Sequence, residues 1–119
     1  MPKAKKPKLW SSHKADTEFS LFIRRRDGKC VRCGNKNFLQ NSHYWSRVHS
    51  SVRYDPENCD TLCAKHHFEW EYDKQGAYRL WKIEQLGEER YALLEHRKKQ
   101  FKSRQDAIEE CMQFLGVLK

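Results

Sequence analysis

Apolar residues between positions 19 and 23 recur at helical spacing near the start of the chain. This pattern predicts a helix that begins at Asp16 or Thr17, either of which can cap it, and that ends at Gly28. Three consecutive arginines, residues 24–26, occupy the predicted last turn, where they suit the negative end of the helix dipole. We therefore expect a first helix whose carboxyl end is strongly basic.

Further helices are predicted in the second half of the chain. One is expected over residues 63–74, and Gly76 then interrupts the pattern. A second helix would follow and end at Gly87, and a third would contain Tyr91 and its neighbours. Ser103 is followed three residues later by an aspartate, which resembles a capping box and predicts the start of a last helix.

The segment between these helical regions is expected to be irregular and to contain two short strands. The strand candidates are residues 38–45 and 58–62, and the polar stretch over residues 46–58 predicts a loop between them. Together the elements indicate one α+β domain over residues 16–119. Residues 1–15, which contain two prolines and several lysines, are expected to form a flexible basic arm.

The composition limits the class of protein. The chain has 119 residues, of which 38% are apolar, so it has room for one domain with a small core. The sequence contains neither an apolar run of about 20 residues nor an apolar segment after its basic start. We therefore expect neither a membrane span nor a secretory leader, and a cytoplasmic location in which cysteines stay reduced.

Positive charge gathers in the first half of the chain. Lys and Arg total 24 against 16 Asp and Glu, which gives a formal net charge of +8. Residues 1–53 contain thirteen Lys or Arg and three Asp or Glu. Residues 54–119 contain eleven Lys or Arg and thirteen Asp or Glu. A basic half of this kind favours a polyanionic partner, most simply nucleic acid, over the alternative of a solvated tail and helix face.

Two pairs of potential metal ligands have the same spacing. Two residues separate Cys30 from Cys33. The same spacing separates Cys63 from His66, and 29 residues lie between the pairs. Zn²⁺ prefers four tetrahedral sulfur and nitrogen ligands, so we expect a structural zinc site that stabilises the small core. The alternatives are that Cys59 replaces the histidine as fourth ligand, or that the first pair is a separate redox couple.

The segment that contains and follows these pairs holds further residues capable of chemistry. They form three short stretches, Asn41-Ser42-His43-Tyr44, Asp55-Pro56-Glu57-Asn58 and Cys63-Ala64-Lys65-His66-His67. In this order they resemble the HNH, or ββα-metal, nuclease motif in its zinc-bracketed form. The chain is more narrowly similar to small phage-encoded HNH proteins, including NinG-type recombination proteins. The resemblance covers residues 30 to about 71.

The resemblance implies a fold and an activity. The fold would be a ββα-metal core over about residues 30–74, stapled by zinc, with a flanking N-terminal helix and C-terminal helices over about residues 76–118. The activity would be that of a divalent-metal-dependent DNA endonuclease that nicks or cuts both strands, in phage recombination or packaging. The catalytic ion would be Mg²⁺ or Mn²⁺. The partners would be DNA and a phage packaging or recombination protein.

Individual roles carry over from the motif to this chain. His43 would be the general base that activates water, and Asn58 would hold the loop that orients it. His67 would bind the catalytic ion. Glu71, one helical turn later, shares its face and could be a second ligand, the alternative being an ordinary surface carboxylate. Ser42 departs from the motif, because many HNH proteins have a metal-binding Asp, Glu or His directly before the base.

Arginines near the motif are candidates for phosphate contact. Arg47 and Arg53 flank the loop after the predicted base, and Arg32 could extend this surface. Because no recognition helix stands out, we expect backbone contacts with weak sequence preference. Two alternatives to a nuclease stay open. One is a non-catalytic zinc-dependent DNA-binding module, which the serine at position 42 favours, and the other is a module that docks a partner protein.

Overall fold

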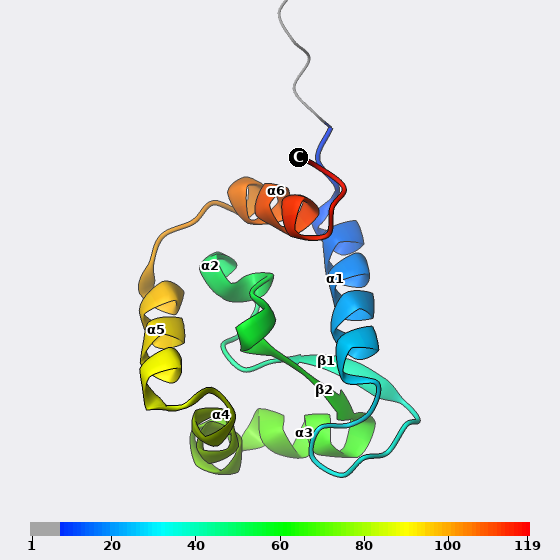
Figure 1. Cartoon of the computed structure of the whole chain (residues 1–119), viewed down its shortest axis with the longest axis vertical. Coiled ribbons are helices and arrows are strands. Elements are labelled where there is room, and N and C mark those ends of the chain that lie inside the picture. The colour runs from blue at the N-terminus through cyan, green and yellow to red at the C-terminus, as the bar shows by residue number, and fades with distance from the viewer. Residues whose placement is uncertain (1–7) are drawn as a thin grey trace, which may run out of the picture.

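The computed structural model describes residues 8–119 as a small β-hairpin surrounded by helices (Figure 1). In chain order the elements are α1 (Ser12–Asp27), β1 (Leu39–His43), α2 (Ser50–Arg53), the 3₁₀ turn η1 (Pro56–Asn58), β2 (Cys59–Cys63), α3 (Ala64–Tyr72), the π turn η2 (Lys74–Tyr78), α4 (Arg79–Leu86), α5 (Glu88–Lys99) and α6 (Arg104–Phe114). In Figure 1, α1, α6, α5, α4 and α3 follow one another around the hairpin and α2. The predicted α+β class is confirmed, and both predicted strands are present.

Helix α1 begins earlier than predicted. The Ser11 side chain accepts a hydrogen bond at 3.1 Å from a backbone N–H in the first turn, so this serine is the N-cap. The predicted starts at Asp16 or Thr17 are therefore wrong, because a better-placed cap lies upstream of both. The expected arm over residues 1–15 is correspondingly too long, and its residues 1–7 lie outside the described part of the chain.

Other predicted helix ends are confirmed. Gly28 adopts a φ of 70° after α1, and its N–H donates to the Arg24 carbonyl at 2.8 Å. Helix α4 ends at Gly87. The Ser103 hydroxyl accepts from the N–H of Asp106 at 3.0 Å and caps α6. These ends are set by interactions within a few residues, which is why the sequence pattern locates them.

The two strands form an antiparallel hairpin in which Ser42 lies opposite Asp60. Because side chains alternate along a strand, this pair faces one side of the hairpin and His43 faces the other. Helix α1 covers the His43 side, where Thr61 Oγ1 donates to the Ile23 carbonyl at 3.1 Å. The turn between α3 and α4 covers the Ser42 side.

The segment between the strands is more ordered than the predicted polar loop. Helix α2 and turn η1 interrupt it, so the expectation of a loop over residues 46–58 is wrong. Val52 is fully buried and anchors α2 to the interior. The Asp55 side chain accepts from the Glu57 N–H at 3.0 Å and caps η1. Val52 is thus one of the contacts that hold this segment against the core.

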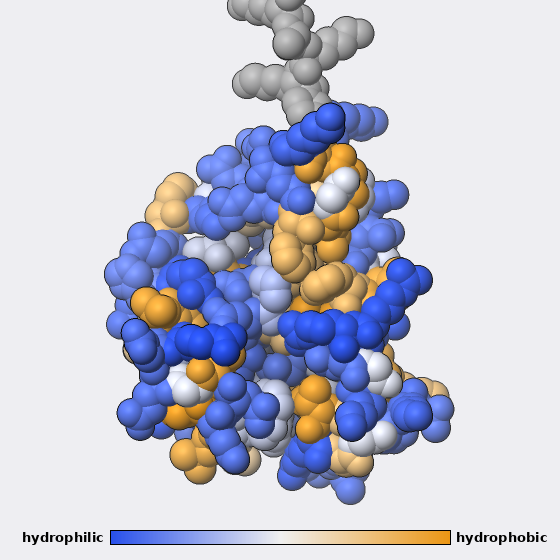
Figure 2. Space-filling view, viewed as in Figure 1, coloured by the Kyte–Doolittle hydropathy of each residue, from blue (hydrophilic) through white to orange (hydrophobic). Residues whose placement is uncertain are grey.

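The buried side chains form two clusters. The first joins α1 to α6 and consists of Ala15, Phe19, Ile23, Cys59, Ile108, Cys111 and Met112. The second joins the hairpin to α3, η2 and α5 and consists of Cys30, Tyr44, Leu62, Cys63, Trp70, Tyr78 and Tyr91. Figure 2 shows apolar residues reaching the surface where α6 meets α1, on a face that is otherwise mostly hydrophilic. The hairpin lies between the two clusters and belongs to both.

The break predicted at Gly76 is confirmed and has a steric cause. Gly76 has φ −100° and ψ −108°, which no helical residue adopts. A Cβ at this position would lie 2.2 Å from Asp73 Oδ1, so a larger residue would displace the carboxylate that accepts from the Ala77 N–H. The longest helix between residues 8 and 119 is α1, with 16 residues. No helix in this part of the chain has both the length and the hydropathy that crossing a membrane requires.

Helix α4 is joined to the hairpin by a buried ion pair. Lys82 is 2% exposed, and its Nζ lies 2.8 Å from Asp60 Oδ2. The same oxygen accepts a hydrogen bond from the Tyr78 hydroxyl at 2.8 Å. A buried charge is costly unless it is paired, so the two partners depend on each other.

Lys82→Met is expected to lower the free energy of unfolding by about 3 kcal/mol, because it leaves the Asp60 carboxylate buried without its cation. Adding Asp60→Asn removes the second charge and should recover part of this loss. Urea unfolding of the metal-loaded protein measures both variants. Lys102→Met disrupts the more exposed pair with Glu110 and serves as the control, with a change within about 1 kcal/mol. If Lys82→Met lowered the free energy of unfolding no more than Lys102→Met does, the stabilising role of the Lys82–Asp60 pair would be contradicted.

Candidate metal centre and adjoining cleft

The four predicted zinc ligands lie together. The Sγ atoms of Cys33 and Cys63 are 3.9 Å apart. His66 Nδ1 lies 3.4 Å from Cys63 Sγ and 3.6 Å from Cys30 Sγ. Ordinary zinc–ligand bonds at tetrahedral angles separate two sulfurs by roughly 3.8 Å and a sulfur and a nitrogen by roughly 3.6 Å. The cluster therefore has the dimensions of a Cys₃His site and could hold a zinc-like metal ion.

The cluster joins two segments that are distant in sequence. Cys30 and Cys33 lie in the turn after α1, where the Gly34 N–H donates to the Cys30 carbonyl at 2.8 Å. Cys63 ends β2 and is the N-cap of α3, and His66 lies in the first turn of that helix. Burial opposes ionisation of the Cys30 thiol. Hydrogen bonds from the Cys63 backbone and the His66 ring outweigh burial and lower its pKa to about 6, which favours the thiolate that a metal binds.

Cys59 is not a member of the cluster. Its side chain is fully buried in the α1–α6 core, in the same cluster as Phe19 and Ile23. Burial raises the pKa of its thiol well above the ordinary value, so it stays protonated. The open choice of fourth ligand is thereby resolved in favour of His66. The next residue, His67, lies outside the cluster, and its ring contacts Gln40 and Glu71 instead.

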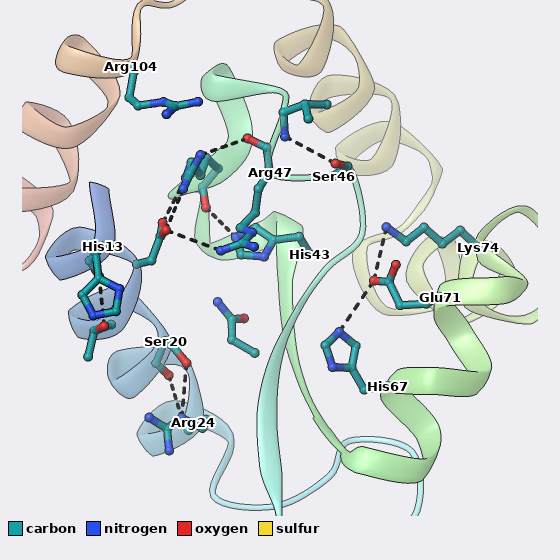
Figure 3. A pocket seen from close by; sticks show the side chains of 15 residues that line it. His13, Ser20, Arg24, His43, Ser46, Arg47, His67, Glu71, Lys74 and Arg104 are labelled. Carbon is teal, nitrogen blue, oxygen red and sulfur yellow. Dashed lines mark hydrogen bonds and ion pairs between the residues drawn. The ribbon is translucent and has the colours of Figure 1, made fainter. Parts of the chain in front are cut away.

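A cleft of about 930 Å³ opens between α1, the loop after β1, α3 and the start of α6. Figure 3 shows side chains from these elements directed into it. His43, His67 and Glu71, three of the predicted catalytic or metal-binding residues, line it together. Its lining includes five Lys or Arg side chains and two carboxylates, so the cleft is positively charged overall. A cavity of this kind suits an anionic ligand.

His43 is held in one tautomer. Its Nε2 lies 2.9 Å from the Arg53 carbonyl oxygen. A carbonyl can only accept, so Nε2 carries the hydrogen and Nδ1 keeps its lone pair. Burial lowers the pKa of His43 to about 4, and the positive charges of Arg47 and Arg53 act in the same direction. The ring is therefore neutral at pH 7 and can accept a proton at Nδ1.

Asn58 braces the loop that follows His43. Its Oδ1 accepts from the Trp45 N–H at 2.8 Å, and its Nδ2 donates to the carbonyls of Trp45 at 2.9 Å and Val52 at 3.1 Å. The side chain is fully buried and does not line the cleft. Asn58 thus connects the start of the loop to α2, and its influence on the orientation of His43 stays a prediction.

His67 and Glu71 lie side by side on α3. His67 Nε2 is 3.6 Å from Glu71 Oε1, and the other ring nitrogen, Nδ1, is 2.6 Å from Gln40 Oε1. Because an amide oxygen accepts a hydrogen bond, Nδ1 carries the hydrogen. Nε2 therefore keeps its lone pair, which can bind a cation. Burial lowers the pKa of His67, which keeps the ring neutral. Lys74 Nζ lies 3.4 Å from the same Glu71 oxygen.

No third cation ligand stands beside this pair. Among residues 8–119, the cluster around Cys30 is the only group of three or more His, Cys, Asp or Glu side chains close enough to share an ion. Ser42 is 1% exposed and faces the Asp60 side of the hairpin, and it is not among the residues that line the cleft. The pair offers an imidazole nitrogen and a carboxylate oxygen. Mg²⁺ and Mn²⁺ accept such donors while retaining water or phosphate oxygens.

Two of the three arginines predicted to contact nucleic acid are engaged elsewhere. The Arg53 side chain is 9% exposed and bonds Asp16 through Nε at 2.9 Å and Nη2 at 2.6 Å. Arg32 lies outside the cleft and pairs with Glu69. Each of these two guanidinium groups already has a carboxylate partner, and both predicted phosphate contacts stay predictions. Arg47 lines the cleft with a 60% exposed side chain and a longer contact, 3.4 Å, to Asp16, and its phosphate contact also stays a prediction.

Several residues in or beside the cleft were not predicted from the sequence. Gln40 lies two positions before Ser42 on β1, so strand alternation could have indicated that it faces α3. Asp16, Lys74 and Arg104 come from α1, η2 and α6. No spacing relative to the motif points to these three, because only the packing of the flanking helices brings them to the cleft.

The purified chain is expected to hold about one zinc ion, and Cys63→Ser should lose it. Cys59→Ala is the matched control, because it removes a buried cysteine that belongs to the core. It should cost about 1–2 kcal/mol of unfolding free energy through the cavity it creates, yet retain the metal. Elemental analysis after dialysis, with thermal unfolding in the presence and absence of a chelator, measures both effects. Zinc loss in Cys59→Ala with retention in Cys63→Ser would contradict the assigned ligands.

The His43 ring should remain neutral in mildly acidic solution. With a pKa of about 4, less than about a tenth of the rings are protonated near pH 5.5, whereas an ordinary histidine is mostly protonated there. The unfolded chain binds the proton more readily, so the stability that His43 contributes falls as the pH drops from about 6.5 towards 4. NMR of the ring, assigned with His43→Gln, measures the protonated fraction. A titration midpoint at or above the ordinary value would contradict the prediction.

Comparison with known proteins identifies no relative of this chain. No protein-family model, no curated protein and no solved structure matches the chain. The site is therefore defined by its own side chains. They are a Cys₃His cluster that could hold a metal ion and a positively charged cleft with two neutral histidines and a carboxylate.

Proposed function

We propose that this protein is a divalent-metal-dependent DNA endonuclease of the HNH type. The observation that carries the proposal is the convergence of His43, His67 and Glu71 on one cleft with an excess of cations. These residues come from β1 and α3 and occupy the positions that the resemblance to the HNH motif assigns to the base and to the metal ligands. Phage recombination or packaging is the proposed context, and a protein of that machinery is the proposed partner.

The proposed base is His43 Nδ1. Hydrolysis of a phosphodiester needs a water molecule to lose a proton as it attacks phosphorus. A neutral imidazole whose Nε2–H is held by a backbone carbonyl can accept that proton without rotating. The resulting imidazolium would still donate to the Arg53 carbonyl, so the ring needs no rearrangement during the step. The low pKa of the ring, about 4, keeps the accepting form available at neutral pH.

The proposed cation ligands are His67 Nε2 and Glu71 Oε1. A Mg²⁺ or Mn²⁺ ion bound there would neutralise charge on the phosphate and on the departing 3′ oxygen. Gln40 holds the His67 ring with Nε2 directed to the carboxylate. Lys74, next to Glu71, supplies a positive charge to the same end of the cleft. His67 and Glu71 therefore fit a hard divalent ion, to which the protein would supply two ligands.

The proposed substrate contacts are to the phosphate backbone. Arg24 on α1, Arg47 after β1 and Arg104 at the start of α6 line the cleft on different sides (Figure 3). Because guanidinium groups bond phosphate oxygens irrespective of the base, this arrangement supports binding with weak sequence preference and strong salt dependence.

A second candidate is a zinc-dependent DNA-binding module without activity, and the burial of Ser42 favours it. HNH proteins often have a metal ligand at this position, whereas here the hydroxyl lies on the buried side of the hairpin. The cleft would then bind DNA through its cations and hydrolyse nothing. Docking of a partner protein by the C-terminal helices is compatible with either candidate.

Nicking of supercoiled plasmid tests the proposal. With Mg²⁺ or Mn²⁺, the zinc-loaded protein should convert supercoiled to open-circular DNA, and His43→Ala should slow this by at least about 100-fold through loss of the base. Glu71→Gln should raise the Mg²⁺ concentration required by about tenfold. His96→Ala on α5, which does not line the cleft, is the control and should retain full activity.

The same samples separate the two candidates. DNA binding by wild type and His43→Ala is measured in parallel by fluorescence anisotropy. If wild-type protein binds DNA and carries zinc but cuts nothing with any divalent ion, the catalytic proposal fails and the binding module stands. Equal cutting by wild type and His43→Ala would likewise reject His43 as the base.

A further inference from the structure

The carboxylate of Asp16 organises the loop that follows β1, although α1 lies outside the segment that resembles the HNH motif. Its oxygens accept hydrogen bonds from Arg53 Nε at 2.9 Å, Arg53 Nη2 at 2.6 Å and the Tyr54 hydroxyl at 2.8 Å. Arg47 Nη1 lies 3.4 Å from the same group. One side chain of α1 therefore holds three residues of the loop.

Arg53 connects this contact to His43. Its guanidinium is bound by Asp16, and its backbone carbonyl accepts the hydrogen on His43 Nε2 at 2.9 Å. Because that hydrogen bond fixes both the direction and the tautomer of the ring, a displaced carbonyl would disturb both. The side chain and the carbonyl of a single residue thus join α1 to the proposed base.

The Arg53 carbonyl cannot be held in place by α2 alone. This helix has four residues, which is too short to be stable without tertiary contacts. One anchor is Asn58, whose Nδ2 donates to the Val52 carbonyl at 3.1 Å. Another is Asp16, which holds the Arg53 side chain and the next residue, Tyr54. The two anchors lie on either side of the carbonyl that His43 uses.

Asp16 is not available for a direct role in chemistry. It lines the cleft, but Arg53 and Tyr54 already donate three hydrogen bonds to its two oxygens. Those hydrogen bonds and the nearby arginines outweigh the effect of burial and lower the pKa of the carboxyl group, so it stays ionised and does not donate a proton at neutral pH. Its contacts lead to the loop and, through the loop, to the ring of His43.

We propose that Asp16 is a positioning residue for His43, acting through Arg53, and that α1 is for this reason part of the catalytic apparatus. In this arrangement the motif provides the base, and a helix outside the motif sets the geometry in which the base works. The kinetic consequence depends on the proposed nuclease function, whereas the state of the His43 ring does not.

Two variants test the proposal in the full-length, zinc-loaded chain. Asp16→Asn keeps the size of the side chain but removes its charge and one accepting oxygen. Arg53→Lys keeps the positive charge but cannot bond both carboxylate oxygens in the same way. Asp27→Asn is the matched control, because Asp27 is also an α1 carboxylate bound by an arginine, Arg26, and does not line the cleft.

The first measurement is the tautomer of the His43 ring by ¹⁵N NMR at neutral pH. Wild type and Asp27→Asn should show the hydrogen on Nε2. Asp16→Asn and Arg53→Lys should show a mixture of the two tautomers, because the carbonyl that selects Nε2 is no longer held. The second measurement is plasmid nicking, in which both variants should lower kcat by about 10–100-fold and change KM by less than about twofold.

The results that would reject the positioning role of Asp16 differ from those that would reject the nuclease proposal. If wild type does not cut DNA, the function fails while the ring tautomer still decides the role of Asp16. An unchanged Nε2–H tautomer in folded Asp16→Asn and Arg53→Lys would overturn the positioning role. A rise in KM at constant kcat would also overturn it, since the pair would then serve substrate binding. Failure of both variants to fold would assign Asp16 to stability alone.

Discussion

The meeting of three cysteines and one histidine ties the turn after α1 to the start of α3, and the position of the cleft depends on this tie. Consecutive residues on a helix point about 100° apart. When His66 turns to the cluster, His67 is therefore directed towards Gln40 and Glu71. Zinc binding in zinc-finger peptides contributes roughly 10–16 kcal/mol, as much as the whole net stability of a typical domain, about 5–15 kcal/mol. In a chain with two small buried clusters, a bound metal would add substantially to the contacts that hold α3, among them those of the buried Trp70.

The alternation of side chains along β1 places His43 and Ser42 on opposite sides of the hairpin. His43 faces α1, so its surroundings are set by Asp16 and the loop that α1 holds. Ser42 faces the α3–α4 side, where the buried pair of Asp60 and Lys82 fills the space beside the hairpin. The strand thus presents a titratable group to one side and a small, inert one to the other. Both helical layers are needed because each side of the hairpin is completed by a different part of the chain.

The features that the sequence predicts well are those decided within a few residues. The ligand spacing, the stop at Gly28 and the cap at Ser103 depend on neighbours three or four positions away, and all three are present. The start of α1 was misplaced because several capping residues compete there, and Ala15, which precedes the predicted start, belongs to the α1–α6 core. The contact of Arg53 with Asp16 was not predicted, because Asp16 lies 37 residues earlier in the chain. No local pattern encodes that contact, and a lone arginine in a polar loop resembles a phosphate ligand.

The burial of Ser42 has a consequence for how the proposed nuclease would use its ion. With His67 and Glu71 as the protein ligands, water and substrate phosphate would complete the coordination shell. Cation and DNA would then raise each other's affinity, since coupling between two bound ligands is reciprocal. Lys74 strengthens this dependence, because its ammonium lies 3.4 Å from the Glu71 carboxylate and must yield to an entering cation. The free protein would therefore hold its catalytic ion weakly and its zinc tightly, and the active centre would be assembled only when DNA enters the cleft.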